Sequence, residues 1–224
     1  MKRARPIIAI DGPVGAGKST VARALAHALD FTYVNTGAMY RAVAIAAREA
    51  NVKPDGAGVD AALEKLFAAI VIKFEGERVI LNGRDITSIL GEPEIGELAS
   101  QFSARAIVRE RMRGVQRAAG DAGGVVMEGR DIGSVIFPGA EFKFFLDAAV
   151  EVRARRRFEE LASKGVKAGF GEVLEQLKQR DERDLKRALA PLRRAPDAVT
   201  IDSTGLGVDQ VVMLMKARIL AGPA

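Results

Sequence analysis

The chain has 224 residues, of which 48% are hydrophobic and 28% are charged, a composition that excludes disorder, collagen and coiled coil. The longest strictly apolar run, residues 66–72, is far shorter than the ~20 residues of a membrane-spanning helix, and the apolar stretch 6–10 is too short for a signal-peptide core. We therefore expect a cytoplasmic protein that spans no membrane. With no cysteine and one histidine, disulfides, thiolate nucleophiles and zinc clusters are excluded, which leaves lysine, arginine and carboxylate chemistry.

The basic excess is concentrated in one segment. Residues 150–194 contain 13 Lys and Arg against 8 Asp and Glu, which equals the net charge of +5 for the whole chain. Two interpretations are open: a solvated helical surface, or a pocket or flap for phosphate-rich ligands. Arginine outnumbers lysine there, and because its guanidinium matches phosphate geometry, this bias favours the second interpretation.

The first fifty residues predict a β-loop-α-β-α order. The apolar run 7–10 stops at Asp11 and Gly12, as a buried parallel strand does where it enters a loop. A helix is expected over 20–30, because its apolar residues recur about every four positions. A second strand over 31–34 and a second helix from Thr36 through 47 follow.

In the next segment, the spacing of the apolar residues changes from a helical period to alternation. A loop over 51–60 and a short helix over 61–69 lead into alternating apolar residues with turns at 75–77 and 82–83. The region 70–87 is therefore expected to form a small antiparallel hairpin or three-stranded sheet inserted into an α/β fold.

The remainder alternates helices and strands again. Helices are expected over 93–117, 150–164, 171–188 and 207–220, and strands over 125–127, 142–146 and 199–201. Such alternation predicts one parallel sheet covered by helices on both faces.

A glycine-rich loop lies between the first strand and the first helix. It matches GxxxxGK[ST], the motif whose backbone N–H groups wrap phosphates, whose lysine reaches the β and γ oxygens and whose hydroxyl binds Mg²⁺. Here Lys18 is that lysine and Ser19 that hydroxyl, so the sequence predicts binding of a nucleoside triphosphate with Mg²⁺. The predicted ATP-binding residues are Gly12, Pro13, Val14, Gly15, Ala16, Gly17, Lys18, Ser19 and Thr20.

Six motifs extend over nearly the whole chain. They are IDGPVGAGKS at 10–19, TGAMYR at 36–41, EGRDIG at 128–133, RDERD at 180–184, KRALAPL at 186–192 and DST at 202–204. Together they resemble bacterial cytidylate kinase. The resemblance implies a P-loop NTPase-like α/β domain over 1–224, with a nucleoside-monophosphate (NMP) binding region at about 36–118 that contains the β insertion at 70–87, and a short arginine-rich lid at about 150–170. It also implies transfer of a phosphoryl group from ATP to CMP or dCMP.

The same resemblance implies an acceptor site. Arg130 would hold the acceptor phosphate and Asp131 would accept a hydrogen bond from the cytosine amino group, the expected partner of a carboxylate. Both follow the strand 125–127, at the carboxyl end of the sheet where ligands of open α/β folds bind. The implied CMP-binding residues are Thr36, Tyr40, Arg41, Ser100, Arg109, Arg130, Asp131, Arg180, Asp184 and Arg187.

Plainer structural interpretations exist for several of these residues. Tyr40 also fits core packing, and Arg109 also fits a solvated helix face. Arg180, Asp184 and Arg187 are spaced i, i+4, i+7 and are expected on one helical face, which is either a salt-bridged surface or, as the resemblance implies, the part that binds the pentose.

Catalysis is expected to rest on alignment and charge compensation by Lys18, Arg153 and Arg157, with the lid excluding water. Between them, Arg155 and Arg156 are expected to be solvated. The acceptor phosphate is mostly dianionic at neutral pH, so no general base is needed. Two departures from the family pattern stand out, Glu128 in place of a shorter Asp and Thr36 in place of a serine.

Two other functions remain open at this point. One is a P-loop kinase for a different monophosphate or a small metabolite. The other is a basic, ATP-binding protein associated with nucleic acid, which is opposed by interleaved acidic residues and 5% aromatics. With no zipper or long apolar edge, we expect a monomer whose partners are ATP and CMP or dCMP, with no nucleic acid and no membrane.

Overall fold

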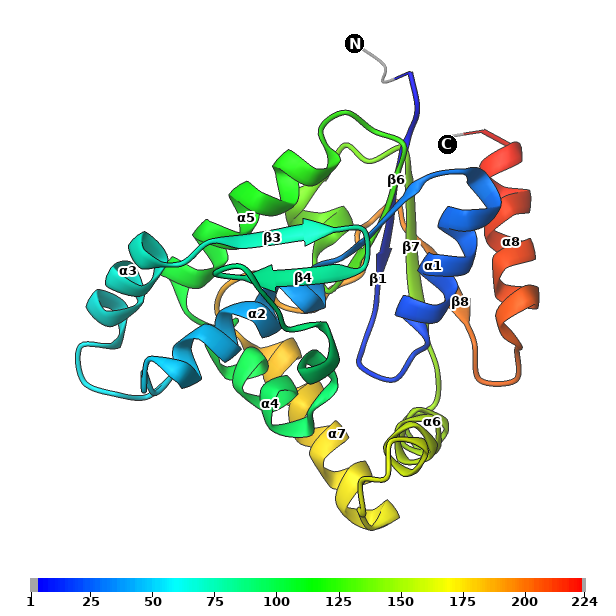
Figure 1. Cartoon of the computed structure of the whole chain (residues 1–224). Coiled ribbons are helices and arrows are strands. Elements are labelled where there is room, and N and C mark those ends of the chain that lie inside the picture. The colour runs from blue at the N-terminus through cyan, green and yellow to red at the C-terminus, as the bar shows by residue number, and fades with distance from the viewer. Residues whose placement is uncertain (1–3, 223–224) are drawn as a thin grey trace. The chain divides into compact units, whose positions relative to one another are not determined.

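The structure is a computed structural model that describes residues 4–222. The chain forms two compact units. The core unit consists of the residues up to Val34 together with those from Ala122 onward, and the inserted unit is Asn35–Asp121. Figure 1 shows the elements of both units, coloured along the chain.

A five-stranded sheet forms the centre of the core unit, in the order β2-β6-β1-β7-β8. The pairs β1–β6, β1–β7 and β7–β8 are parallel, as the alternation of strands and helices predicts. The strands are β1 (Ile7–Asp11), β2 (Thr32–Asn35), β6 (Val125–Gly129), β7 (Phe142–Asp147) and β8 (Val199–Asp202).

Both faces of the central strand are buried, which explains its uninterrupted apolar run. On one face, α1 (Lys18–Leu29) and α8 (Val208–Leu220) pack against each other and on the sheet, as Figure 1 shows. Ile8 and Ile10 lie in the apolar cluster on this side. On the other face, a short turn of π-helix, η2 (Ile132–Ile136), contacts β1. This turn was not predicted from the sequence.

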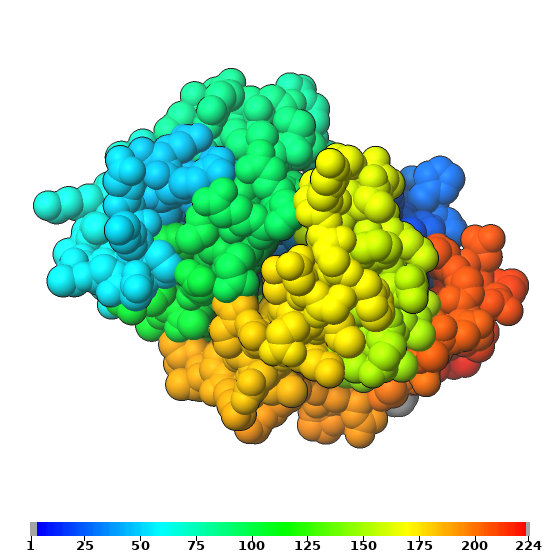
Figure 2. Space-filling view, turned by 90° about the horizontal axis from the view of Figure 1, so that it is seen from below, coloured from blue at the N-terminus to red at the C-terminus, as the bar shows by residue number. Residues whose placement is uncertain are grey.

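The arginine-rich segment folds into two adjoining helices, α6 (Val150–Ser163) and α7 (Phe170–Lys186). Figure 2 shows them side by side on one face, in yellow-green and yellow. Both helices were expected, within two residues at each end. No helix among residues 4–222 is long and apolar enough to cross a membrane.

The inserted unit combines helices with the predicted antiparallel sheet, whose strand order is β3-β4-β5. Asn82 and Gly83 both have positive φ (51° and 81°), the backbone that a two-residue hairpin turn requires. The elements of this unit are α2 (Thr36–Glu49), α3 (Val59–Ala69), β3 (Ile72–Glu75), β4 (Arg78–Leu81), β5 (Arg84–Asp85), η1 (Thr87–Gly91), α4 (Pro93–Phe102) and α5 (Ala106–Gly120).

The single helix expected over 93–117 is wrong, because two helices occupy this region. The Ser103 hydroxyl donates to the carbonyl of Ser100 (2.8 Å), a local bond that competes with continuation of a helix. Arg105 is extended (φ −80°, ψ 133°), and its guanidinium donates to Asp60 from α3 (2.8 Å). This tertiary contact, which the local sequence does not reveal, accompanies the break between α4 and α5.

The C-terminal boundary of α7 also differs from the prediction. The helix ends at Lys186, and Arg187 has extended backbone angles (φ −58°, ψ 138°). The chain then turns at Ala190, whose φ is 47°, immediately before Pro191. Arg187 therefore does not share a helical face with Arg180 at i+7, and the expected placement of this residue on that face is wrong.

Candidate functional site

The loop between β1 and α1 has the backbone that its glycines permit. Gly12, Gly15 and Gly17 all have positive φ, at 151°, 78° and 88°. A Cβ at Gly12 would lie 1.9 Å from the carbonyl oxygen of Leu146, and one at Gly15 would lie 3.0 Å from the backbone of Arg153. The α1 N-terminus has no side-chain cap, so its first-turn N–H groups are available to an anion.

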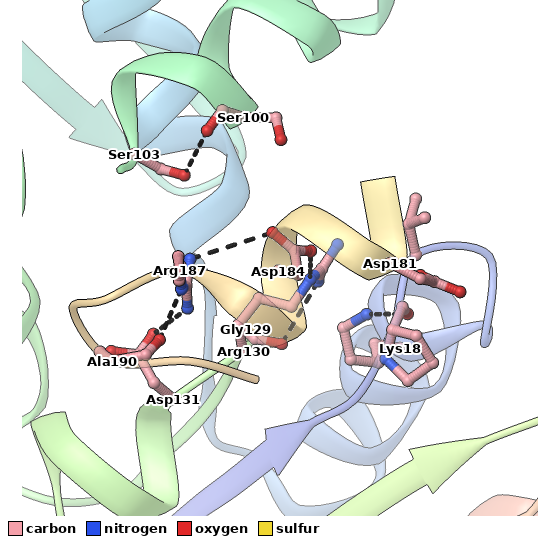
Figure 3. Close-up of polar contacts among 12 residues, drawn as sticks. Lys18, Ser100, Ser103, Gly129, Arg130, Asp131, Asp181, Asp184, Arg187 and Ala190 are labelled. Carbon is pink, nitrogen blue, oxygen red and sulfur yellow. Dashed lines mark hydrogen bonds and ion pairs between the residues drawn. The ribbon is translucent and has the colours of Figure 1, made fainter. Parts of the chain in front are cut away.

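Lys18 is buried within this loop, with 6% of its surface exposed. Its ammonium group donates to the Pro13 carbonyl oxygen (2.6 Å). Figure 3 labels Lys18 and draws a dashed line from its ammonium group. Burial, followed by the nearby positive charge of Arg130, lowers the pKa of Lys18 to about 7. A polyphosphate bound beside Lys18 would restore its full positive charge.

Arg153 connects α6 to the phosphate loop. Its guanidinium donates to the carbonyl of Val14 (3.1 Å) and to that of Ala148 (2.9 Å), and it pairs with Asp181 from α7 (2.7 Å). Arg153 is 6% exposed. The structure thus brings this predicted residue to the loop, while Arg157 pairs with Glu160 on its own helix (2.7 Å).

Both arginines between Arg153 and Arg157 were expected to be solvated, and this is wrong for Arg156. Arg156 donates to the hydroxyl (3.0 Å) and to the carbonyl (2.6 Å) of Ser203, and so joins α6 to the residue that follows β8. Arg155 is exposed and lies over the ring of Phe170, 4.6 Å from its centre.

Beyond β6, a buried cluster of opposite charges gathers residues from β6, α7 and the segments that follow them (Figure 3). Arg130 donates to Asp184 (2.9 Å), and Arg187 lies 3.7 Å from Asp131 and 4.0 Å from Asp184. Asp131 and Asp184 are each 5% exposed. A plain salt-bridged surface is therefore excluded for Asp184 and Arg187.

Two carboxylates of α7 have pKa values that are shifted in opposite directions. Burial alone would raise the pKa of Asp184, but the charges of Arg130, Arg180 and Arg187 hold it below its ordinary value. One turn earlier on α7, burial raises the pKa of Asp181 despite its pairing with Arg153. Three arginines thus act on the single carboxylate of Asp184, and guanidinium groups suit a phosphate.

The inserted unit brings together a second set of predicted residues. Arg109 of α5 is 4% exposed and lies 6.0 Å from the ring centre of Tyr40 on α2, so the solvated-face interpretation of Arg109 is wrong. Thr36 begins α2 and is buried, and Arg41 is half-buried on the same helix. Ser100 is 9% exposed, and its hydroxyl has no hydrogen-bond partner among residues 4–222.

The family comparison covers nearly the whole chain, since the model of the cytidylate kinases matches residues 8–220. The chain belongs to the cytidylate kinase family. It is 47% identical to a cytidylate kinase of Geobacter sulfurreducens over 95% of this chain and 92% of the relative. It is 48% identical to one of Carboxydothermus hydrogenoformans over 92% and 93%. The family makes this protein a nucleoside-monophosphate kinase that uses ATP, and favours CMP phosphorylation over the other functions considered.

A solved structure resembles the whole fold. An uncharacterized protein from Eubacterium ventriosum matches with a TM-score of 0.50 and 14% identity, over 97% of this chain and 99% of that one. This likeness concerns the fold alone, and it agrees with the predicted α/β architecture of this cytidylate kinase family member.

Two residues near the phosphate loop were missed as site residues. Tyr33 of β2 donates to Glu128 of β6 (3.0 Å), and it lies under the guanidinium of Arg23. Asp11, the last residue of β1, accepts backbone N–H groups of η2. A carboxylate that directly follows a buried strand and precedes Gly12 is a signal that the sequence offers for Asp11, but its partners, more than 100 residues away, are not readable there.

The chain's own metal-binding capacity is small. Among residues 4–222 there is no group of three or more His, Asp or Glu side chains that could hold a metal ion. Oxygen donors at or near the phosphate loop include the hydroxyl of Ser19 and the carboxylate of Glu128, which suit Mg²⁺ only if phosphate oxygens complete the coordination. The residues present therefore fit a magnesium ion that arrives with ATP.

Proposed function

We propose that this family member transfers the γ-phosphoryl group of ATP to CMP and to dCMP, in line, and forms ADP with CDP or dCDP. The buried cluster of Arg130, Asp131, Asp184 and Arg187 carries the proposal. Because β6 pairs in register with β1, with Gly129 opposite Asp11, the residues after β6 adjoin the start of the phosphate loop. An anion-binding cluster beside a triphosphate loop is what a phosphotransferase needs.

The donor side uses the loop Gly12–Thr20. Its backbone N–H groups and the uncapped N-terminus of α1 hold the triphosphate, and Lys18 supplies charge at the transferring group. Ser19, with Glu128 nearby, would hold Mg²⁺. The bound ion would supply positive charge that neutralises phosphate oxygens.

The acceptor side uses the residues that the family resemblance implies. Arg130, with Arg41 and Arg187, binds the CMP phosphate, and Arg180 with Asp184 binds the pentose. Asp131 accepts a hydrogen bond from the cytosine amino group. The remaining members of the predicted set, in the inserted unit, contribute to acceptor binding: Thr36, Tyr40, Ser100 and Arg109.

The chemical step requires no proton acceptor on the protein, because the attacking phosphate is mostly dianionic at neutral pH. Lys18 and Arg153 compensate the charge of the transferring group, and the hydrogen bond of Arg153 to Val14 supports this role. Arg157 acts with them from the proposed lid at about 150–170, which excludes water. The NMP-binding region of this proposal is 36–118, and the monomeric state, cytoplasmic location and lack of nucleic-acid binding stay predictions.

The direct test is an assay of ADP release with CMP, dCMP, UMP, AMP and GMP as acceptors. We expect CMP and dCMP to have the highest kcat/KM and the purine monophosphates to be poor acceptors. A preference for AMP or GMP would contradict the proposal, and no acceptor-dependent release above ATP hydrolysis would contradict phosphoryl transfer to any of them.

Asp131→Asn tests the base contact. The amide keeps the size of the side chain but offers a donor. The variant is therefore expected to lose about 1–3 kcal/mol of the free energy with which it recognises CMP, the scale of one good base contact. The gap between CMP and UMP is expected to narrow, because O4 of uracil repels a partly desolvated carboxylate and not an amide donor. An unchanged CMP/UMP ratio would remove Asp131 from the base contact and leave it a structural partner of Arg187.

A further inference from the structure

Asp11 is a buried carboxylate to which the proposed chemistry assigns no task. It is 4% exposed and ends β1, directly before Gly12 of the phosphate loop. Its two carboxylate oxygens accept different backbone N–H groups, those of Ile132 and Gly133, both at 2.8 Å. Each oxygen thus holds one of the first two residues of η2.

These two bonds hold a particular part of the chain. The N-cap of η2 is Asp131, and the carbonyl of Asp131 accepts the N–H groups of Val135 (2.9 Å) and Ile136 (3.2 Å) inside the turn. The first N–H groups of a helical turn have no partner within it and need one from outside. Asp11 supplies that partner, so it holds the peptide that joins Asp131 to Ile132.

The η2 turn is also closely packed against the sheet, next to the two hydrogen bonds to Asp11. A Cβ added to Gly133 would lie 3.1 Å from the side chain of Lys143 and 3.5 Å from Ala9, on β7 and β1. The turn therefore has little room to approach the sheet. Its position above β1 depends on the length and the acceptors of the side chain at position 11.

A neutral residue could not replace these bonds. Burial raises the pKa of Asp11 to about 6, against the lowering effect of the two N–H groups, so a carboxylate is held here at a cost in free energy. Asparagine would avoid this cost, but its amide has one acceptor oxygen and would direct a donor at the second N–H group. Two convergent N–H groups require two acceptors.

We propose that Asp11 is a positioning residue for base selection, which fixes Asp131 relative to the phosphate loop and so sets the preference for CMP over UMP. Asp11 itself touches no base in this proposal. The proposal rests on the proposed function, in which Asp131 accepts a hydrogen bond from the cytosine amino group.

The test compares kcat/KM for CMP and UMP, together with the melting temperature, in the wild type and in Asp11→Asn, Asp131→Asn and the double variant. Asp11→Asn is expected to lower the ratio of kcat/KM for CMP to kcat/KM for UMP about tenfold, the scale of one base contact. Because Asp11 acts through Asp131, the double variant is expected to be no less selective than Asp131→Asn alone.

Asp147→Asn is the matched control. Asp147 ends β7, the strand beside β1, and its carboxylate accepts the N–H of the following residue, Ala148 (2.8 Å), so it binds only its own loop. This variant is expected to leave the CMP/UMP ratio unchanged. Asp11→Glu keeps the charge and both acceptors but adds one methylene, which displaces the turn. Asp11→Glu is expected to lower the CMP/UMP ratio as well, and it can be used for the test if Asp11→Asn does not fold.

The outcomes separate this proposal from the proposed function. If Asp131→Asn narrows the ratio while folded Asp11→Asn and Asp11→Glu only lower the melting temperature, Asp11 is a structural residue and the proposal is overturned. Additive effects in the double variant would also overturn it. If the wild type does not prefer CMP, or Asp131→Asn leaves the ratio unchanged, the proposed base contact fails first, and the role of Asp11 fails with it.

Discussion

The end of β1 and the end of α7 each bury a carboxylate, and the two are stabilised in opposite ways. Asp11 is 4% exposed and Asp184 is 5% exposed. Asp11 receives two neutral backbone N–H groups, and burial raises its pKa to about 6. Asp184 is buried as well, but Arg130, Arg180 and Arg187 hold its pKa below the ordinary value.

The difference shows what each region is suited to do. Neutral donors fix the position of a carboxylate without fully compensating its negative charge. Several arginines compensate that charge, and their remaining positive charge can act on a ligand. The end of β1 is thus suited to holding the η2 turn in place. The end of α7 is suited to receiving an anion, because three arginines act on the one carboxylate of Asp184.

Loss of charge at the phosphate loop gives the largest expected effect. Lys18→Ala is expected to lower kcat at least about 100-fold, the scale for removing one group that stabilises transition-state charge. The melting temperature is not expected to fall, because the ammonium group is buried at a cost that lowers its pKa to about 7. Normal turnover in a folded Lys18→Ala protein would exclude the loop from the reaction.

Loss of the carboxylate from the α7 cluster comes next. Asp184→Ala leaves Arg130, which is 19% exposed at its side chain, and Arg187, at 7%, without this partner. Breaking a buried pair in this way destabilises a protein by about 3–5 kcal/mol. We expect the free energy of unfolding in urea to fall by an amount on this scale.

The matched control for Asp184→Ala lies on the same helix. Glu182 pairs with Lys186 in full contact with solvent, so Glu182→Gln is expected to leave unfolding unchanged within error. Equal effects of the two substitutions would show that the arginines of the cluster do not depend on Asp184.

The sequence predicts local structure and motifs well, and long-range partners poorly. The phosphate loop follows from eight adjacent residues between a strand and a helix, so its position is confirmed by β1 and α1. Every strand of the core sheet is also found near its predicted range. The strands β1 and β6 are fully buried, as the apolar runs of parallel strands lead one to expect. The edge strands β2 and β8 are mostly exposed or half-buried.

What the sequence did not predict depends on contacts between distant segments. The break between α4 and α5 involves Arg105 and Asp60, 45 residues apart. The burial of Arg109 beside Tyr40 and the partners of Asp11 arise in the same way. Arg187 was placed on a helix because periodicity does not reveal the turn at Ala190, although Pro191 was a signal that the helix ends early.

The low pKa of Lys18 gives a third, smaller effect. At pH 8, where Lys18 with a pKa of about 7 is largely neutral, the phosphates of ATP are expected to raise its pKa, so binding takes up a proton. The neighbouring carboxyl of Asp11, with a pKa near 6, is already ionised at this pH and adds nothing. The uptake is expected to be roughly half to one proton.

Titration calorimetry at pH 8 in two buffers of different ionisation enthalpy measures this uptake. Lys18→Arg is the control, because a guanidinium is always charged and binds no further proton. Zero uptake by the wild type would mean that Lys18 is already charged before ATP binds, and that backbone and carboxylate groups compensate its burial.

The smallest expected effect distinguishes the two carboxylates of α7 that pair with arginine. Asp181 is 15% exposed and pairs with Arg153 (2.7 Å), but one of its oxygens is buried without a hydrogen-bond partner among residues 4–222, and burial raises its pKa. Asp181→Asn loses the ion pair and also removes an incompletely compensated buried charge. Since Arg153 keeps its bonds to Val14 and Ala148, we expect unfolding in urea to change by no more than about 1 kcal/mol. A loss as large as that of Asp184→Ala would mean that Arg153, like Arg130, depends on its carboxylate, and that the two carboxylates of α7 contribute alike to stability.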